Sequence, residues 1–554
     1  MHPSSLAKRG TVLLFLAVVA FYFYGLGHLP FVGPDEPRYA QVAREMFLRG
    51  DLITPTLGGR TWFEKPALLY WMMILSFKLF GVSEWAARVP AAVSGVFTVV
   101  AVFVVGRRIE VANDSDNKLQ DYALWSAVAA ATMIGIIVFS QAASFDIVLT
   151  MTTTWALGFY LLYECSAVDE KPGRRLLAGF YCFVGLSLLA KGLVGIVIPV
   201  AVLGLFHLFQ RRLPRKQILL SVLWGLPLAL IVAGTWYLPV TSRHGWLFID
   251  QFFIQHHFAR YVSNKYHHAQ PAYYYLLVVP LLSLPWTLFL FSGLIRFISR
   301  LWRGKAANLD RGDLQVKLLM ALTLAWFFCP LVFFSFSGSK LPGYVLPLLP
   351  AGALIVGKQL CELRDGSGKW LLRATAFAYV MFALGVGGYS WRTGTLSLIC
   401  AFLLAAPLLV AGCFPFLAAR KASASVALMA GMTVVELIAV MLCVAPRFAE
   451  FESSRRLLRL AAARGYSQTT IYGMQRSDRT PEFYAAGRVV YGNDGEPIMY
   501  EGPAQVIYEC RRRNEVLLAF VPIEDVGSLT AAADVQAEVI GDNTRYALVA
   551  VRSR

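Results

Sequence analysis

Apolar runs long enough to cross a lipid bilayer recur along most of this chain. A membrane-spanning helix needs roughly 20 predominantly apolar residues, and by that measure about thirteen runs precede residue 445. With 57% hydrophobic and 15% charged residues among 554, the composition excludes a soluble enzyme. The runs lie at 11–29, 85–106, 122–140, 145–164, 176–190, 192–209, 217–240, 272–298, 316–336, 341–360, 370–390, 394–416 and 424–444.

Basic residues indicate which loops face the cytoplasm. The net charge of +17 would suit nucleic-acid binding in a soluble protein, but basic cytoplasmic loops explain it in a membrane protein. The short apolar segment 66–80 decides the sidedness. If it does not cross and the N-terminus is cytoplasmic, every alternate loop is basic, as the positive-inside rule requires. We therefore expect 66–80 to be a juxtamembrane helix that lies in the interface or re-enters it.

Thirteen spans place the C-terminal tail on the outer side of the membrane. The tail is rich in arginine and contains short β-prone runs at 470–472, 506–508, 516–520 and 547–551. About a hundred residues are enough to bury a separate core. The sequence therefore predicts a mostly α polytopic membrane domain, 1–445, and a small α/β domain, 446–554.

Acidic and basic side chains gather in the outer loops. The first outer loop contains Asp35 and, at its end, Glu64-Lys65, while Asp146 follows the third span. Ionisable groups at a membrane boundary are costly and are therefore candidates for function. The structural alternatives stay open: helix capping for Asp35 and Asp146, and an interfacial ion pair for Glu64-Lys65.

A long outer loop, 241–271, and a glycine-rich turn, 337–344, complete this set. The turn carries Lys340 and Tyr344 and is a candidate anion nest. Histidines in the long loop, with Glu64, raise the alternative of a Mg²⁺ or Zn²⁺ site, whose candidate ligands are Glu64, His256 and His257. No established ligand spacing is present, so interfacial histidines are favoured and no cofactor is required.

The chemistry of these loops indicates a lipid-linked donor. Lys65, Arg260 and Lys340 are cations suited to phosphate, and the carboxylates suit hydroxyls, an amine or a cation. ATP and nucleotide sugars are not normally supplied outside the cytoplasm. A transferase facing outward therefore takes its group from a carrier such as a polyprenyl phosphate.

Four motifs resemble those of the lipid A aminoarabinose transferases, which are GT-C membrane glycosyltransferases related to protein O-mannosyltransferases. The motifs lie at 33–40, 63–71, 258–261 and 339–344. The resemblance implies a GT-C fold and transfer of 4-amino-4-deoxy-L-arabinose from undecaprenyl phosphate to lipid A phosphates. It also implies a periplasmic active site in a bacterial inner membrane and resistance to polymyxin and other cationic antimicrobial peptides.

The same resemblance assigns roles to individual residues. Asp35 matches the catalytic-site aspartate, Lys65 and Arg260 match phosphate-binding cations, and Tyr39 and Tyr344 match residues near the carrier phosphate. Glu64 and Asp146 match further carboxylates that line the cavity and are candidate catalytic residues with Asp35, and Arg38 and Lys340 are candidate substrate-binding residues. Ala67 departs from the pattern, since relatives often have a second proline there.

The expected reaction is a single displacement that inverts the anomeric carbon, with Lys65 and Arg260 stabilising the departing phosphate. A lipid A phosphate is already anionic and needs no general base, so Asp35 is expected to orient the donor or hold a cation. One alternative is a GT-C transferase that passes mannose or another sugar to protein or glycan. A remote alternative is a lipid-linked sugar transporter, against which the sequence shows no paired broken helices. We expect a monomer that binds no nucleic acid.

Overall fold

The computed structural model describes residues 5–112, 119–169, 173–259, 270–303, 311–363, 366–418, 421–475, 479–492 and 495–554. Contacts between residues divide the chain into two units. The helical unit comprises Met1–Tyr24, Glu64–Leu69 and Pro90–Val440, and the tail unit comprises Gly25–Phe63, Tyr70–Val89 and Met441–Arg554.

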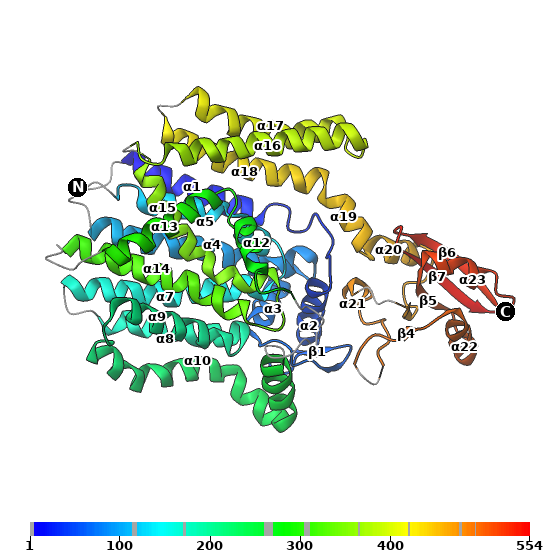
Figure 1. Ribbon diagram of the computed structural model, residues 1–554. Helices are drawn as coiled ribbons and strands as arrows, with labels where there is room; N and C mark the ends of the chain where they lie inside the picture. Colours follow the sequence, from blue (N-terminus) through cyan, green and yellow to red (C-terminus); the bar gives the residue numbers. More distant parts are fainter. Residues whose placement is uncertain are drawn as a thin grey trace. The chain divides into compact units, whose positions relative to one another are not determined.

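The helical unit consists of long helices that lie side by side (Figure 1). They are α1 (Ser5–Phe23), α4 (Glu84–Ala112), α5 (Tyr122–Thr132), α6 (Ile134–Ser140), α7 (Phe145–Asp169), α8 (Arg174–Lys191), α9 (Val194–Gln210), α10 (Lys216–Phe248), the π-helix η2 (Ile249–Ala259), α12 (Tyr274–Leu282), α13 (Thr287–Arg303), α14 (Arg311–Ser335), the 3₁₀-helix η3 (Pro342–Leu348), α15 (Leu349–Glu362), α16 (Lys369–Thr393), α17 (Leu398–Leu417) and α18 (Ala422–Cys443).

Every predicted apolar run contains helix, but not all of these helices meet a length and composition test for crossing. In the described part of the chain, 8 helices pass that test, or up to 10 if each bent pair is one span. The helix α9 is short, with 17 residues, and α8 carries arginines at its start and Lys191 at its end. The multi-pass membrane architecture is confirmed, while the count of thirteen stays a prediction.

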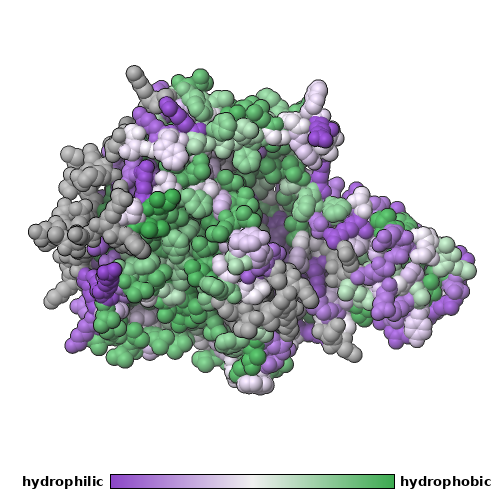
Figure 2. All heavy atoms as spheres, viewed as in Figure 1, coloured by the Kyte–Doolittle hydropathy of each residue, from purple (hydrophilic) through white to green (hydrophobic). Residues whose placement is uncertain are grey.

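Lipid-facing surfaces remain apolar. On α10, Leu223 and Leu238 are 76% and 73% exposed, which a water-soluble helix would avoid over a large patch. Figure 2 shows apolar residues over much of the visible face of the helical unit. Segment 66–80 is observed as α3 (Leu68–Phe80), whose 13 residues span only about 20 Å at 1.5 Å per residue. That length agrees with the prediction that it does not cross.

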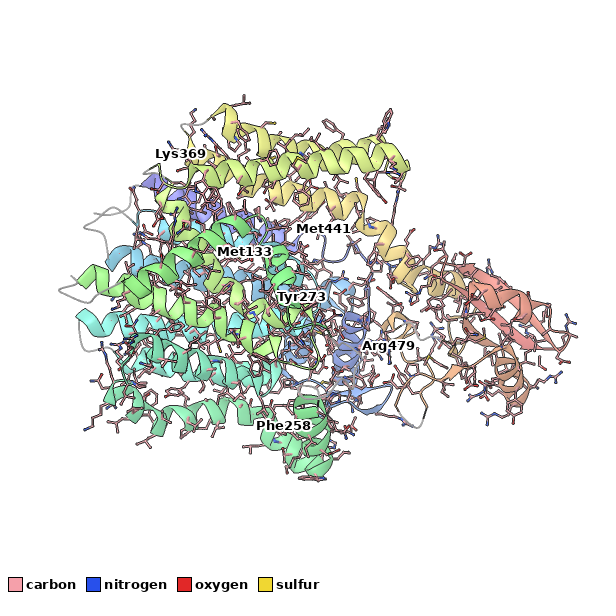
Figure 3. The ribbon with its side chains drawn as sticks, in the orientation of Figure 1. Met133, Phe258, Tyr273, Lys369, Met441 and Arg479 are labelled. Carbon is pink, nitrogen blue, oxygen red and sulfur yellow. The ribbon has the colours of Figure 1, made fainter. Side chains whose placement is uncertain are left out.

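Two expectations about chain regularity are wrong. The structure contains paired broken helices: α5 and α6 bend by 58° at Met133, and α12 and α13 bend by 115°, and Figure 3 labels Met133 at the first break. The extended backbone of Met133 has no marker in the sequence. The long loop 241–271 also begins as helix, because α10 continues through a kink at Gly245, where φ is 52°, into η2.

The tail unit contains a five-stranded mixed sheet of order β4-β3-β5-β7-β6. Strand β3 pairs in parallel with β4 and β5, whereas β7 pairs antiparallel with β5 and β6. Its elements are α2 (Asp35–Arg49), β1 (Thr56–Leu57), β2 (Arg60–Thr61), α3, α19 (Ala445–Glu452), α20 (Arg455–Ala463), β3 (Ile471–Met474), α21 (Thr480–Tyr484), β4 (Met499–Tyr500), α22 (Pro503–Arg513), β5 (Leu517–Pro522), η4 (Ile523–Asp525), α23 (Val526–Thr530), β6 (Val535–Asp542) and β7 (Tyr546–Ser553).

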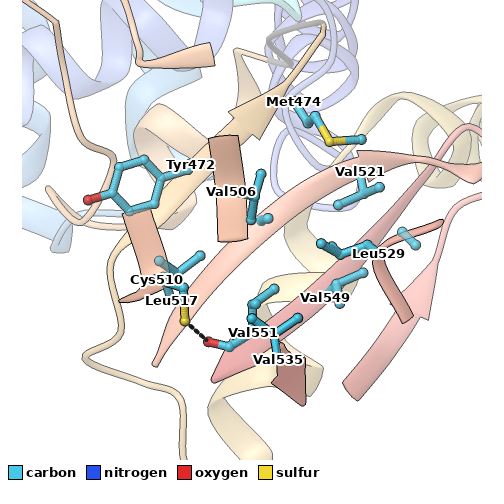
Figure 4. Packing of buried hydrophobic residues seen from close by; sticks show 12 residues of the cluster. Tyr472, Met474, Val506, Cys510, Leu517, Val521, Leu529, Val535, Val549 and Val551 are labelled. Carbon is cyan, nitrogen blue, oxygen red and sulfur yellow. Dashed lines mark hydrogen bonds between the residues drawn. The ribbon is translucent and has the colours of Figure 1, made fainter. Parts of the chain in front are cut away.

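The predicted α/β tail is confirmed, with one wrong element. All residues of β5 are buried, as expected of a central strand covered on both faces. Figure 4 shows the hydrophobic cluster that covers one of these two faces, with Val521 and Val549 among its members. The run 506–508 lies inside α22 instead of a strand, because Pro503 begins a helix favourably and Val506 and Cys510 share its buried face.

The tail packs within its unit against parts of the first outer loop. The backbone N–H of Phe31 donates to the Tyr484 hydroxyl at 2.7 Å, and Arg455 pairs with Glu84 at 3.0 Å. The Arg44 guanidinium lies 4.8 Å from the ring centroid of Phe483. A domain boundary at residue 445 stays a prediction about independent folding of the tail.

Candidate active site

Two charged side chains from neighbouring helices meet in the helical unit. Asp146 lies in the first turn of α7, and Lys191 is the last residue of α8. The Lys191 ammonium donates to Asp146 Oδ1, and the side chains are 13% and 18% exposed. Lys191 Nζ also lies 4.4 Å from the centroid of the Tyr344 ring. The structure thus brings together two predicted residues, Asp146 and Tyr344, and one that the sequence analysis missed.

Lys191 had a signal in the sequence. It is a lysine at one end of an apolar run, and Arg174 and Arg175 at the opposite end belong to one of the basic loops predicted to face the cytoplasm. A basic residue on the outer side runs against the positive-inside rule, and such exceptions indicate function. Its partner lies 45 positions earlier in the chain, so the pair itself is not visible without the fold.

Lys191 lines a pocket of about 80 Å³ that also contains the predicted pair Glu64-Lys65. Lys65 Nζ donates to Glu64 Oε1 at 2.9 Å, and the two side chains are mostly buried. The lining residues are Glu64, Lys65, Pro66, Lys191, Val194, His256, Phe333, Phe334, Ser337 and Tyr344. Two cations therefore face one small, largely apolar space, where electrostatic interactions are stronger than in water.

The Lys340 side chain hydrogen-bonds to backbone carbonyls around its own turn. Its ammonium donates to the carbonyl oxygens of Ser337, at 2.7 Å, and Gln270, at 3.0 Å, and the residue is 7% exposed. The Tyr275 hydroxyl donates to the carbonyl of Leu341 at 3.1 Å. These bonds fix the turn 337–341 beside the pocket. Phosphate binding by Lys340, and an anion nest in this turn, stay predictions.

The surroundings of Gly343 explain why this position of the turn is a glycine. A Cβ at this position would overlap Asp146 Oδ2 and would also crowd Phe139. Glycine therefore lets the backbone of η3 approach the carboxylate. The backbone N–H of Asp146 donates to the hydroxyl of Ser144, which immediately precedes α7, at 3.1 Å.

The predicted residues Asp35, Arg38 and Tyr39 all lie on α2 in the tail unit. Asp35 is half-exposed and accepts a hydrogen bond from Arg38 Nη2 at 2.8 Å, while Tyr39 is buried. Neither Asp35 nor its neighbour caps the helix, because the N-cap is Pro34 and makes no side-chain bond. The capping alternative for Asp35 is therefore wrong.

The neighbour, Glu36, pairs with Arg88 instead. Both Glu36 oxygens accept from that guanidinium at 2.8 Å. Arg88 also donates to the carbonyls of Leu26, Leu29 and Pro30. This pair ties the segment that precedes α2 to the start of α4 within the tail unit.

Arg260 and the side chain of His257 lie outside the described residues, so their roles stay predictions. Among the side chains that the structure does describe, no three His, Cys, Asp or Glu residues are grouped as a metal site would require. His256 lines the pocket with Glu64, but Glu64 is paired with Lys65.

Residues 64–237 match the model of the dolichyl-phosphate-mannose-protein mannosyltransferase family. Among curated relatives, the undecaprenyl phosphate-alpha-4-amino-4-deoxy-L-arabinose arabinosyl transferase 1 of Pseudomonas fluorescens (strain Pf-5) is 30% identical over 65% of this chain and 61% of its own length. The corresponding transferase of Aeromonas salmonicida is 29% identical over 72% of this chain and 66% of its own. The chain thus matches less than two thirds of these relatives' length.

Solved structures share the fold over nearly the whole chain. The crystal structure of ArnT from Cupriavidus metallidurans bound to undecaprenyl phosphate gives a TM-score of 0.76 with 22% identity, covering 98% of both chains. The archaeal oligosaccharyltransferase AglB from Archaeoglobus fulgidus gives 0.52 with 12% identity, covering 93% of this chain and 70% of that one. The predicted fold of a lipid-linked-sugar transferase is confirmed.

Proposed function

We propose that this chain, a homologue of the undecaprenyl phosphate-aminoarabinose arabinosyl transferases, moves 4-amino-4-deoxy-L-arabinose from undecaprenyl phosphate to a phosphate of lipid A. The reaction takes place on the periplasmic side of a bacterial inner membrane. The observation that carries the proposal is the pocket in which Lys65 and Lys191 lie with Glu64 and Tyr344. The sequence relatives and the shared fold support it.

The two lysines suit the phosphate of the donor. Negative charge develops on the carrier phosphate as the sugar leaves, and fixed cations in a site of low polarity stabilise that charge most effectively. Among the described residues, Lys191 Nζ has one carboxylate partner and one aromatic face. It can therefore donate to a phosphate oxygen without leaving Asp146. Arg260 is proposed as a third phosphate cation, on the resemblance alone.

An apolar groove next to Lys191 suits the polyprenyl chain. Its volume is about 650 Å³, and its walls come from α8 and α10. Leu188 and Leu193, on either side of Lys191 in the chain, line it, and the Tyr237 hydroxyl fixes the end of α8 by donating to the Leu188 carbonyl at 3.0 Å. A cation beside an apolar groove is the arrangement that a lipid phosphate requires.

The displacement balances without a proton acceptor. An anionic oxygen of the lipid A phosphate attacks the anomeric carbon, and the bond from that carbon to the carrier phosphate oxygen breaks. Undecaprenyl phosphate leaves with the electron pair, and the anomeric centre inverts. Asp146 and Glu64 are carboxylates suited to the 4-ammonium group of the sugar. Asp35 is proposed to orient the donor, again on the resemblance.

Mass spectrometry of lipid A from cells with and without this protein tests the proposal. We expect a mass increase that matches one or two aminoarabinose groups, together with decreased sensitivity to polymyxin, and neither with Lys191→Met. Unmodified lipid A in cells that make the carrier-linked sugar would contradict it. The match to mannosyltransferases over 64–237 favours a second candidate, sugar transfer to protein or glycan, which would leave lipid A unchanged and glycosylate another acceptor.

A further inference from the structure

A second pocket in the helical unit shares no residue with the one that holds the lysines. Its volume is about 260 Å³ and its surface is almost entirely apolar, apart from a few hydroxyls and the carboxyl group of Glu436. The lining residues come from the two broken helix pairs and from α16, α17 and α18: Ile134, Leu284, Pro285, Thr287, Leu288, Thr375, Ala378, Tyr379, Phe382, Val386, Leu408, Thr433, Glu436 and Leu437.

The two helix breaks meet at this pocket and are bonded to each other. The Ile134 N–H, at the start of α6, donates to the Leu284 carbonyl between α12 and α13 at 3.0 Å. The Trp286 indole donates to the Thr132 hydroxyl at 2.8 Å. Non-helical backbone at membrane depth occurs where it is buried in protein or lines a cavity. The two helix breaks therefore form part of the wall of this pocket.

Glu436 is a carboxyl group within the membrane-spanning helix α18. It lies seven residues before the end of that helix at Cys443, about 10 Å from its outer end at 1.5 Å per residue. Glu436 Oε2 is buried and has no hydrogen-bond partner among the described residues, and the same holds for Thr375 Oγ1 in the same pocket. The Tyr379 and Thr433 hydroxyls are hydrogen-bonded to each other at 2.5 Å, and the Thr433 hydroxyl donates to the Met429 carbonyl at 2.8 Å.

These groups define the chemistry of an occupant. Leaving a carboxyl oxygen unpaired in apolar surroundings costs free energy, so a ligand that supplies a hydrogen bond there is favoured. The apolar lining requires methylene groups along the rest of the ligand. An acyl chain that carries a hydroxyl group meets both requirements, because its O–H can donate to Glu436 and its oxygen can accept from Thr375.

We propose that this pocket binds a hydroxylated acyl chain of the lipid acceptor, with the chain hydroxyl between Glu436 and Thr375. The inference rests on the proposed function, because lipid A carries 3-hydroxyacyl chains whereas the ester-linked chains of ordinary phospholipids lack that hydroxyl. The pocket then acts in acceptor recognition, separately from the lysines that bind phosphate.

Steady-state transfer by the purified full-length enzyme tests this proposal. Glu436→Met removes both carboxyl oxygens at similar volume, and we expect it to raise KM for lipid A about three- to tenfold, the range for one hydrogen bond. The kcat and the KM for the undecaprenyl-linked donor stay unchanged. Glu436→Gln keeps an acceptor oxygen and restores most of the affinity.

A steric variant gives an independent measurement. Ala378→Trp places an indole in the pocket, and we expect it to raise KM for lipid A at least as much as Glu436→Met. Its matched control is Leu384→Trp on the same helix α16, whose side chain is 60% exposed. The control keeps the wild-type KM.

The chain hydroxyl is tested with a synthetic lipid A whose acyl chains lack it. Wild type uses this acceptor with the raised KM, and Glu436→Met adds no further loss. Equal KM values for both acceptors in wild type, or an unchanged KM in both pocket variants, overturn the inference and leave the proposed function intact. Failure of wild type to modify lipid A at all overturns the proposed function.

Discussion

Two ion pairs, one in each unit, have similar chemistry and different surroundings. Glu36 and Arg88 of the tail unit are buried, with side chains 10% and 5% exposed. Asp146 and Lys191 of the helical unit are nearly as inaccessible. The first cation makes five hydrogen bonds, to both oxygens of Glu36 and to the carbonyls of Leu26, Leu29 and Pro30. The second donates to one carboxylate oxygen and faces an aromatic ring.

The difference separates a pair with a structural role from the pair that we propose to act in transfer. Every guanidinium donor group of Arg88 is engaged, so a ligand would have to displace a protein acceptor, and the pair holds three carbonyls of one segment in place. Lys191 has capacity for a new acceptor and lines a pocket. Burial therefore does not distinguish the two pairs, whereas the hydrogen-bonding capacity of the cation beside a cavity does.

The largest effect is expected for Arg88→Met. It leaves Glu36 without its partner and three carbonyls without a donor, and breaking a buried pair on one side costs about 3–5 kcal/mol. We expect a strong fall in the thermal unfolding midpoint in detergent. Glu36→Gln combined with Arg88→Met serves as the control and recovers part of the loss. A single variant as stable as wild type would show that the pair is not structural.

Lys191→Met is expected to have the opposite effect to Arg88→Met, with a large loss of activity and a small loss of stability. We expect kcat/KM for transfer to fall roughly 10²–10³-fold, the range for removing one group that stabilises developing negative charge. The unfolding midpoint falls much less than in Arg88→Met, because Asp146 stays near the N-terminus of α7, where a negative charge is favourable. Lys216→Met, at the exposed start of α10, is the control and keeps full activity. Normal kinetics in Lys191→Met would remove this lysine from the mechanism.

Gly343→Ala is expected to have an intermediate effect on the same pair. The added methyl group pushes Asp146 away from Lys191, and displacement of a catalytic group by about 1 Å costs up to roughly 10²-fold in rate. Overpacking costs about 1–3 kcal/mol of stability. Gly385→Ala on α16 has open space around its Cβ and leaves activity unchanged. Equal activity of both variants would show that the carboxylate position is not critical.

The smallest effect concerns a charge cluster on α22 of the tail unit, in which the buried Glu509 carboxylate accepts from the more exposed Arg512 and Arg513. Hydrogen bonds from Arg512, and then Arg513, lower the pKa of Glu509 below its ordinary value of 4.5. A lowered folded-state pKa stabilises the fold above the ordinary pKa, and this contribution disappears as pH falls through the folded-state value. Glu509→Gln therefore lowers the unfolding midpoint slightly at pH 7 and by less at pH 3. A larger loss at pH 3 than at pH 7 would contradict the sign.

The sequence predicts the features that depend on local composition. Apolar length locates the helices, and the 13 residues of α3 agree with the prediction that it does not cross. Short β-prone runs in the tail indicate β3, β5 and β7. The strand prediction at 506–508 is wrong because helix and strand preferences compete in short apolar segments. Packing of Val506 and Cys510 on the sheet favours the helix α22.

Features that depend on tertiary contacts are less visible. Asp146 and Tyr344 are predicted individually, but their connection runs through Lys191, which only the fold reveals. The break at Met133 is stabilised by a bond to the carbonyl of Leu284, far along the chain. Lys340 reads as a phosphate ligand in the sequence and bonds two loop carbonyls in the structure. A side chain's type can be read locally, whereas its partners cannot.

The close approach of η3 to Asp146 also constrains how this chain can evolve. Every single-base change that replaces a glycine adds a Cβ, and at Gly343 that atom would overlap Asp146 Oδ2. No single-base substitution at Gly343 is therefore neutral as long as the carboxylate is needed. Related chains that use the aspartate should keep glycine there, and a chain that has lost it should show compensating change around the first turn of α7.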